Sequence, residues 1–600
     1  MTRTEVRGFD LPTARTTPDG ARTEYAYDTE LRLVSVTGPT GLVWRYSYDP
    51  AGRLAREVEF NGRRLDYTYD AAGQLESVDS TGAGKTVVRR DLTGRVVARR
   101  SGSLVSTFSY DAAGRVVRAT NADADVVLER DALGRVLTES IDGRPVASRY
   151  DLLGRRVWRR TASGAESRWD YGPDDRPVAL RAGSHLVAFD YDIAGREVSR
   201  RMGHGILLAQ TWDPASRLVE QTLTVPDRTV PDRTAPAPAA QSRLVQRRAF
   251  SYRADSSLTA VDDLLAGLRR YDLDAAGRVT AVRSAGATER YDYGPTGAPT
   301  RAAVPGPAAD TNGSRDYSGT LLSAAGSVRY KHDPAGRVVL RQRKPLSSGP
   351  RTWRYAWNGE NRLVEVTTPD RDRWRYRYDA FGRRVAKERV AADGSVAERI
   401  DFAWDGAFLA EQSSSTGAVT WDWDEDALRA LTQRERDLSQ DEVDERFYAI
   451  VTDLVGTPTE LVSPDGSLAS STRTTLWGTT TATGPADCPL RFPGQYHDPE
   501  TGLDYNQQRY YDPATARYTS PDPLGLAGGP DPHAYVPNPT TWIDPLGLTP
   551  CEIPWSSPSV GRAARDLEQG ATSVTVRSRS EAAELSSAGI RATDMSTRRA

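Results

Sequence analysis

The chain has 600 residues, with 79 Lys and Arg against 81 Asp and Glu, so its net charge of −2 excludes a broadly cationic surface for nucleic acid or anionic lipid. Hydrophobic residues make up 38%, beside 50 glycines and 37 prolines, which predicts a folded chain whose sheets carry much polar surface. Two cysteines and five scattered histidines exclude a disulfide framework and structural zinc, so we predict no metal and no cofactor.

The N-terminal residues carry no export signal that the sequence makes visible. MTRTEVR lacks the apolar stretch of a secretory leader, and no apolar run along the chain is long enough to span a membrane. We therefore expect no transmembrane segment and a cytoplasmic chain before any delivery step.

A short element, Tyr/Trp-Asp-x-x-Gly-Arg-Val/Leu, recurs from the N-terminus onwards. Its spacing is 20 or 21 residues over most copies, and one doubled gap holds a degenerate copy at Tyr171 and Asp174. A fixed period of this length predicts stacked supersecondary units. The aspartate, or asparagine in one copy, stands at Asp28, Asp49, Asp70, Asp91, Asp111, Asp131, Asp151, Asp192, Asp213, Asp255, Asp274, Asp333, Asn358 and Asp379.

Each repeat is predicted to be a β-hairpin. Segments such as 44–48 (WRYSY) alternate large and polar residues, and Asp-x-x-Gly supplies a turn whose glycine can adopt a positive φ. Helical templates fit poorly, because a glycine returns every 20 residues and β-branched and aromatic residues dominate between the turns. We interpret the repeated Tyr and Asp as structural, the ring covering the next hairpin and the carboxylate fastening the turn.

Two stretches interrupt the repeat array, and a third closes it. Residues 224–241 and 299–326 are rich in Pro, Ala, Gly and Ser, which predicts surface loops inserted between hairpins. The charged stretch 421–446 contains Leu428, Leu431 and Leu438 among many ionisable residues, which predicts a helical linker.

The repeats and the region after them resemble the YD repeats of RHS proteins, bacterial relatives of teneurins and of toxin-complex C components. The repeat resemblance covers about residues 20–410. A more specific series follows from 447 to 548: YAIVTDLVGTPTE, FPGQY, RYYDP, YTSPDPLGL, AYVPNP and WIDPLGL. Two departures from the family pattern are Ala516, where glycine is usual, and Asp531, where asparagine is common.

The resemblance implies a mainly β fold, in which the hairpin ribbon spirals into a hollow shell closed by a core plug. The implied domains are a shell over 1–420, the helical linker over 421–446, an RHS core over 447–548 and a variable α/β-like segment over 549–600. It also implies that the core cuts its own chain between Leu548 and Thr549 and that the shell encloses the C-terminal segment.

Two carboxyl groups can hydrolyse a peptide without Cys, Ser-His or metal, when one is ionised to activate water and the other stays protonated. The candidates are Asp522 and Asp544, each the first residue of a DPLGL frame, and they match the two aspartates that the family assigns to self-cleavage. Arg509 matches the family's neighbouring arginine, which could hold a carboxylate ionised or bind the developing oxyanion. The alternatives are two aspartates that only start turns and an arginine in a structural ion pair.

The segment 549–600 is short for an independent enzyme and contains no histidine or lysine, which excludes a His-based nuclease site built from it alone. A helix capped by Ser559 and a strand over 573–577 are predicted there. We interpret the segment as a truncated toxin whose reaction the sequence does not name.

Three functions remain open at this point. The first is a secreted or cell-surface RHS toxin that encloses and cuts free its effector, with an immunity protein and a delivery component as partners. The second is a YD-repeat scaffold that binds carbohydrate or a partner surface. The third is an orphan shell with an inactive tail. None of them predicts direct binding of nucleic acid by the shell.

Overall fold

The computed structural model describes residues 2–203, 205–226, 242–306, 309–344, 349–424, 426–439 and 444–552. Over these residues the chain is almost entirely β, with strands β1 (Arg3–Arg7) to β50 (Cys551–Glu552). Three short 3-10 segments are the only helical turns in the described ranges: η1 (Gly8–Asp10), η2 (Ala309–Thr311) and η3 (Gly525–Ala527). The predicted β class is confirmed, whereas the elements predicted after residue 552 lie outside the described residues.

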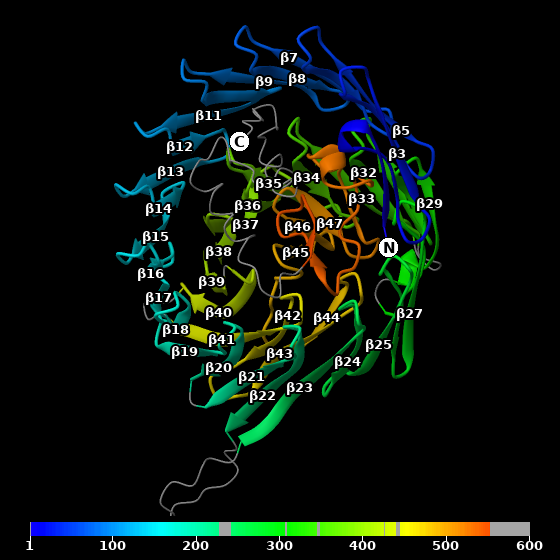
Figure 1. Cartoon of the computed structure of the whole chain (residues 1–600). Helices are drawn as coiled ribbons and strands as arrows, with labels where there is room; N and C mark the ends of the chain where they lie inside the picture. The colour runs from blue at the N-terminus through cyan, green and yellow to red at the C-terminus, as the bar shows by residue number, and fades with distance from the viewer. Residues whose placement is uncertain are drawn as a thin grey trace, which may run out of the picture.

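One antiparallel sheet of 44 strands forms the wall of the molecule, from β1 to β44 (Thr480–Thr483). Each strand pairs with the next strand in sequence, as β5 (Val43–Tyr48) does with β6 (Leu54–Val58). In Figure 1 this ribbon curves around the orange strands β46 (Leu503–Asn506) and β47 (Arg509–Asp512), which lie inside the ring. The spiral ribbon implied by the family resemblance is therefore confirmed.

The repeat motif builds each hairpin through contacts within about one repeat length. At a typical turn, Asp49 Oδ1 accepts the Arg53 N–H at 2.9 Å, and Gly52 adopts φ +80° and donates to the Asp49 carbonyl. The Arg53 guanidinium lies 4.5 Å from the centre of the Tyr69 ring, and the Tyr69 hydroxyl donates to the Leu54 carbonyl at 2.8 Å. The repeated aspartate and tyrosine thus fasten turns and cover neighbouring hairpins, as predicted.

Ion pairs join parts of the wall that lie far apart in sequence. Arg99 Nε contacts Glu360 at 2.6 Å across 261 positions, and Arg159 contacts buried Asp422 at 2.8 Å across 263 positions. Later strands therefore pack along the edge of earlier ones, which closes the spiral. Because both partners of the second pair are almost fully buried, breaking it would leave an uncompensated charge inside the wall.

The predicted helical linker over 421–446 is wrong. Its described residues form parts of strands β39 (Gly417–Asp424), β40 (Arg429–Asp437) and β41 (Asp444–Thr452) and the turns between them. Both faces of β40 are covered, so its charged residues pair inside the wall and the alternation typical of a half-exposed strand is absent. This loss of periodicity is the physical reason for the error.

The loop predicted over 299–326 is also wrong for most of its length. It contains strands β28 (Pro299–Ala303), β29 (Gly313–Ser318) and β30 (Leu321–Ala325), in which Ala324 and Ala325 are buried. The small residues serve close packing there. Of the other predicted loop, β22 (Leu218–Pro226) covers the start, and residues 227–241 lie outside the described ranges.

One repeat lies two residues from its predicted position. Arg253, not Asp255, occupies the first position of the turn, because the Arg253 N–H donates to the Ser257 carbonyl and the Ser256 N–H donates to Arg253. Asp255 instead contacts the Arg253 guanidinium at the surface. Alignment on aspartate alone missed this exchange.

The core region 447–548 begins as wall and ends as a separate unit. Strands β41 to β44 continue the large sheet, after which β45 (Tyr496–Asp498), β46, β47 and β48 (Arg517–Tyr518) form a second sheet of four strands. The wall thus extends past the predicted shell boundary at residue 420. The small sheet carries the candidate site, since Arg509 begins β47.

Candidate self-cleavage site

The two DPLGL frames lie at the ends of different segments of the core. Residues 522–526 follow β48, while residues 544–548 follow β49 (Trp542–Ile543). The chain then returns to pair β50 with β49, Ile543 opposite Cys551. The Leu548–Thr549 bond therefore lies in a loop whose two ends are held together by strand pairing.

Arg509 brings both predicted aspartates together. Its Nη2 atom lies 2.9 Å from Asp522 Oδ2 and 3.2 Å from Asp544 Oδ2. The same nitrogen donates to the Leu548 carbonyl oxygen at 3.3 Å. Three oxygens thus surround one guanidinium nitrogen, and one of them belongs to the bond predicted to be cut.

The peptide of Leu548 is held from two sides. Its N–H donates to Asp544 Oδ1 at 2.7 Å, while Arg509 Nε donates to the neighbouring Gly547 carbonyl at 2.6 Å. Leu548 itself is buried. These contacts fix the orientation of the Leu548 carbonyl relative to both carboxyl groups, and such positioning is what a reaction at that carbon would require.

Gly547 is required by the close approach of two backbones. Its φ is +69°, and a Cβ built there would lie 2.5 Å from the Asn506 carbonyl oxygen. Any other residue would strain the loop or push it away from β46 and β47. The glycine of the DPLGL frame therefore places Leu548 against Arg509.

Burial changes the acidity of both aspartates. Asp522 is 4% exposed and Asp544 is fully buried. Burial raises the pKa of Asp522 to about 7, against the opposing effect of Arg509. Burial also raises the pKa of Asp544, although the Arg509 charge, the Leu548 N–H and the Tyr518 hydroxyl act in the opposite direction. Burial therefore moves the pKa of both carboxyls upward, and one Arg509 cation opposes that shift in each.

Sequence analysis missed two residues of this site, Tyr518 and Asn506. The Tyr518 hydroxyl donates to Asp544 Oδ2 at 2.8 Å, and Asn506 Nδ2 donates to the Tyr518 oxygen at 2.7 Å. Tyr518 opens the YTSPDPLGL run, so the family motif contained a signal for it. Asn506 carried no signal, because only the pairing of β46 with β47 brings it to the site.

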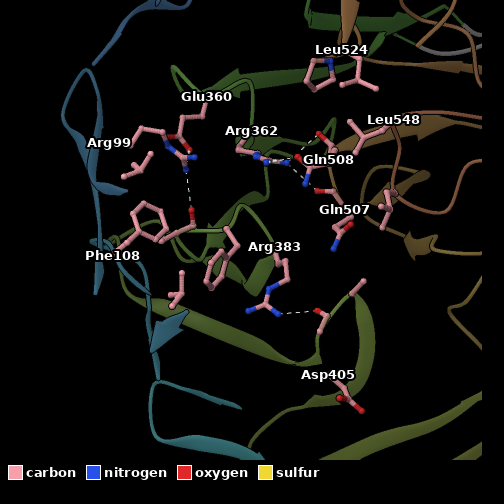
Figure 2. Close-up of a pocket in the computed structure, with 18 of the residues that line it drawn as sticks. Arg99, Phe108, Glu360, Arg362, Arg383, Asp405, Gln507, Gln508, Leu524 and Leu548 are labelled. Carbon is pink, nitrogen blue, oxygen red and sulfur yellow. Dashed lines mark hydrogen bonds and ion pairs between the residues drawn. The ribbon is translucent and has the colours of Figure 1, made fainter. Parts of the chain in front are cut away.

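The site borders a cavity of about 1290 Å³ inside the shell. Asp522 and Leu548 line it, together with wall residues such as Arg99 and Arg383. Figure 2 shows Leu548 beside Gln508 and facing the wall across the cavity. Leu548 therefore borders an interior space whose wall carries charges of both signs.

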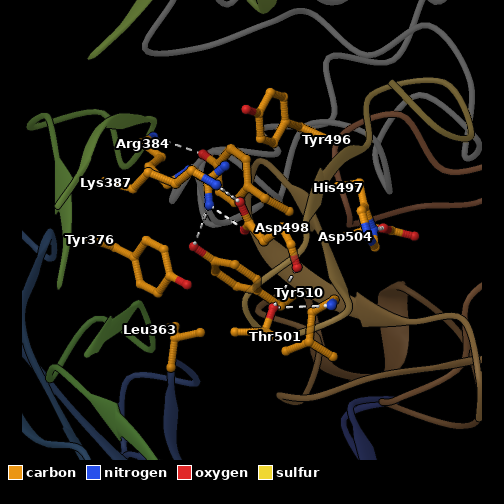
Figure 3. A network of polar contacts seen from close by, with 12 residues as sticks. Leu363, Tyr376, Arg384, Lys387, Tyr496, His497, Asp498, Thr501, Asp504 and Tyr510 are labelled. Carbon is orange, nitrogen blue, oxygen red and sulfur yellow. Dashed lines mark hydrogen bonds and ion pairs between the residues drawn. The ribbon is translucent and has the colours of Figure 1, made fainter. Parts of the chain in front are cut away.

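A second buried cluster joins the core to the wall (Figure 3). Arg384 and Lys387 of β36 (Arg384–Val390) contact Asp498 of β45 at 2.5 and 3.1 Å. Burial raises the pKa of Asp498, but the two cations outweigh this effect and leave the pKa below its ordinary value. These ion pairs connect β36 of the wall with β45 of the core and do not involve the Leu548 loop. We therefore infer that the cluster anchors the core to the wall.

Thr549 is half-buried, and its hydroxyl has no hydrogen-bond partner among the described residues. Asp531, the departure noted above, pairs with Arg517 at 2.7 Å. Ala516, the other departure, adopts φ +62°, the conformation that favours glycine. In the described part of the chain, neither residue forms a hydrogen bond or ion pair with the Leu548–Thr549 peptide. No cluster of three or more potential metal ligands is found within the described ranges.

Comparisons with known proteins decide the family. A family model described as Teneurin YD-shell matches residues 241–526, and one described as RHS Repeat matches residues 27–64. The chain belongs to the RHS (YD-repeat) family. The shell match includes Arg509 and Asp522 of this RHS chain and ends before Asp544.

Curated relatives of this RHS chain include bacterial toxins. It is 33% identical over 389 residues to Probable deoxyribonuclease RhsA of Dickeya dadantii, covering 63% of the chain and 25% of that protein. It is 30% identical over 472 residues to Toxin protein Tse5 of Pseudomonas aeruginosa, covering 67% of the chain and 34% of that protein. The RHS chain thus spans about a quarter to a third of the length of these relatives.

Solved structures share its fold. The crystal structure of TcdB2-TccC3-Cdc42 has a TM-score of 0.61 at 16% identity, covering 91% of this RHS chain and 36% of the other. A Tc holotoxin pore from Photorhabdus luminescens has a TM-score of 0.63 at 16% identity, covering 93% and 34%. Across the described residues of the RHS chain, no helix is long and apolar enough to cross a bilayer.

Proposed function

We propose that this chain is the shell and self-cleaving core of an RHS toxin, and that it hydrolyses its own Leu548–Thr549 bond. The observation that carries the proposal is the single Arg509 nitrogen that contacts Asp522, Asp544 and the Leu548 carbonyl oxygen together. Two buried carboxyls with raised pKa values beside a peptide carbonyl form the arrangement that acid–base hydrolysis requires.

In the first step, ionised Asp544 takes a proton from a water molecule as the water oxygen bonds to the Leu548 carbonyl carbon. Arg509 stabilises the negative charge that develops on the carbonyl oxygen. Asp544 is the ionised partner because three groups donate to it, namely Tyr518, Arg509 and the Leu548 N–H.

In the second step, protonated Asp522 gives its proton to the Thr549 nitrogen and the C–N bond breaks. One water molecule is consumed, a carboxyl group forms on Leu548 and an amine forms on Thr549. At the end of the reaction Asp544 carries the proton taken from water, and Asp522, which has given its proton away, is ionised. No metal or cofactor enters this balance.

The segment from Thr549 onwards is the proposed effector, and the shell around the cavity is its container. Relatives named a deoxyribonuclease and a double-stranded DNA deaminase toxin suggest a toxic enzyme as cargo. We propose delivery out of the producing cell for use against other bacteria or a host, with a cognate immunity protein as partner. Cleavage would leave the cargo held only by noncovalent contacts, including the pairing of β49 with β50.

The test is the intact mass of the purified chain under denaturing conditions, beside Asp522→Asn and Asp544→Asn. The matched control is Asp453→Asn, because Asp453 is a turn aspartate whose Oδ1 accepts three backbone N–H groups and touches no part of the site. Mass is needed because acid scission at Asp-Pro would cut before residue 523 or 545 and give different fragments.

We expect a fragment that begins at Thr549 in the wild type and in the control, and its absence from both site variants. An uncut wild-type chain overturns the proposal and leaves the binding scaffold as the better hypothesis. A cut that persists in Asp544→Asn overturns the aspartyl mechanism while keeping self-cleavage.

A further inference from the structure

Tyr518 contacts both charged partners of the site. Its hydroxyl donates to Asp544 Oδ2 at 2.8 Å, and its ring centre lies 3.6 Å from the Arg509 guanidinium carbon. The side chain is 2% exposed. Burial and the Asp544 charge raise the pKa of Tyr518 well above its ordinary value, so the hydroxyl keeps its proton and acts as a donor.

Asn506 sets the direction of that hydrogen bond. Its Nδ2 donates to the Tyr518 oxygen at 2.7 Å and to the Asp544 carbonyl at 2.8 Å. Because Tyr518 has one proton and its oxygen already accepts from Asn506, the proton is directed to the Asp544 carboxylate. Asn506 is fully buried, so water does not compete for these contacts.

We propose that Tyr518 and Asn506 are positioning residues for self-cleavage, which hold Asp544 in place and make it the ionised member of the pair. The inference rests on the proposed self-cleavage and extends it to two residues that touch neither the scissile peptide nor the attacking water. Within the described part of the chain, Asp522 has no such hydroxyl donor and contacts the Arg509 guanidinium and the Leu524 N–H. The difference in donors assigns the roles of acid and base.

The direction in which the pKa of Asp544 moves depends on which form of its carboxyl group the Tyr518 hydroxyl stabilises. A donor to the ionised carboxylate lowers its pKa, so removing the Tyr518 hydroxyl raises the pKa of Asp544. Self-cleavage requires ionised Asp544, and the acid side of its pH profile therefore moves upward. The basic side depends on protonated Asp522, with its pKa of about 7, and stays in place.

The groups that face Asp544 come from every element packed against it. They are the Arg509 cation from β47, Tyr518 from β48, Asn506 from β46, Tyr535 from the segment before β49, and the Asp522 carboxyl. Burial keeps the pKa of Tyr518 and of Tyr535 well above their ordinary values, so among these groups the profile reports the two carboxyls.

The experiment follows cleavage of the full chain made by cell-free translation in a short pulse and moved to buffers from about pH 5 to about pH 9. The variants are Tyr518→Phe and Asn506→Asp, the second of which keeps the shape but removes both N–H donors. Tyr511→Phe is the matched control, because Tyr511 is a buried neighbour of Tyr518 whose hydroxyl donates to the Trp477 carbonyl.

We expect a bell-shaped profile for the wild type and for Tyr511→Phe. In Tyr518→Phe the acid midpoint should rise by about one pH unit or more, with a narrower bell and a maximum rate about tenfold lower. Asn506→Asp should move the acid midpoint in the same direction.

A Tyr518→Phe profile that matches the wild type overturns the inference and leaves self-cleavage intact. An equal shift in Tyr511→Phe also overturns it, because the effect would then be a general consequence of a lost buried hydroxyl. If the wild type is not cut at all, the proposed function fails instead. A thermal unfolding midpoint for each variant separates misfolding from a change in chemistry.

Discussion

Two turns of the core share the five residues DPLGL, at 522–526 and 544–548, but their backbones continue differently. After Asp522 the chain coils into η3, and the Leu526 carbonyl accepts the Gly529 N–H at 3.3 Å. After Asp544 the chain runs to β50, and the Leu548 carbonyl accepts a hydrogen bond from Arg509. The same five residues thus place the Leu526 carbonyl against the backbone of the next turn and the Leu548 carbonyl against the Arg509 guanidinium.

The two aspartates also bind different backbone groups. Asp522 Oδ1 accepts the N–H of Leu524, two residues on, whereas Asp544 Oδ1 accepts the N–H of Leu548, four residues on. The first contact is a turn-forming one, and the second reaches Leu548, the residue at the proposed cut. The comparison teaches that the five-residue frame supplies the carboxyl, and the surrounding core decides what that carboxyl contacts.

Replacing Arg509, which donates to the Leu548 carbonyl of the second turn, should have the largest effect on self-cleavage. In Arg509→Lys, a point charge replaces a planar fork that contacts three carbonyls and two carboxylates, so the oxyanion loses its positioned donor. We expect self-cleavage to slow by about 100- to 1000-fold, measured as the cut fraction over time. Arg517→Lys is the control, a buried arginine paired with Asp531. Wild-type speed in Arg509→Lys would contradict the assigned role.

The paired glycines of the two turns provide the next test. In Gly547→Ala the new Cβ would collide with the Asn506 carbonyl at 2.5 Å, which displaces Leu548 from Arg509. In Gly525→Ala the Cβ would meet only the Trp44 ring edge at 3.2 Å. We expect Gly547→Ala to be cut at least about tenfold more slowly, and Gly525→Ala to be cut normally with a loss of about 1 kcal/mol of stability. Equal cleavage of both variants would show that the close approach is unimportant.

The smallest effect on cleavage is expected when the residue after the first DPLGL frame is made the same as the residue after the second. Ala527→Thr gives the first turn the sequence DPLGLT of the second. The Leu526 carbonyl accepts the Gly529 N–H, and no guanidinium of the described residues donates to it, so we expect no fragment that begins at residue 527 in the intact mass, and an unchanged cut after Leu548. Detection of such a fragment would mean that the local sequence alone directs cleavage.

Local contacts explain what the sequence by itself determined about this protein. The Asp, Gly, Arg and Tyr of each repeat interact within about one repeat length, as Asp49, Arg53 and Tyr69 do, so the hairpin ribbon follows directly from the period. The family motifs also located Arg509, Asp522 and Asp544, which the structure brings around one peptide. Their catalytic role stays a prediction until the variants are measured.

Only the tertiary structure decided features that depend on distant partners. The strands over 421–446 were wrongly predicted as a helix. Asp422 is buried beside Arg159, 263 positions earlier, and burial on both faces removes the alternation by which a strand is recognised. The placement of Tyr518 and Asn506 against Asp544 likewise requires three strands and a loop to meet. Sequence patterns record contacts at a fixed spacing, whereas these contacts arise only when the spiral closes and the core folds inside it.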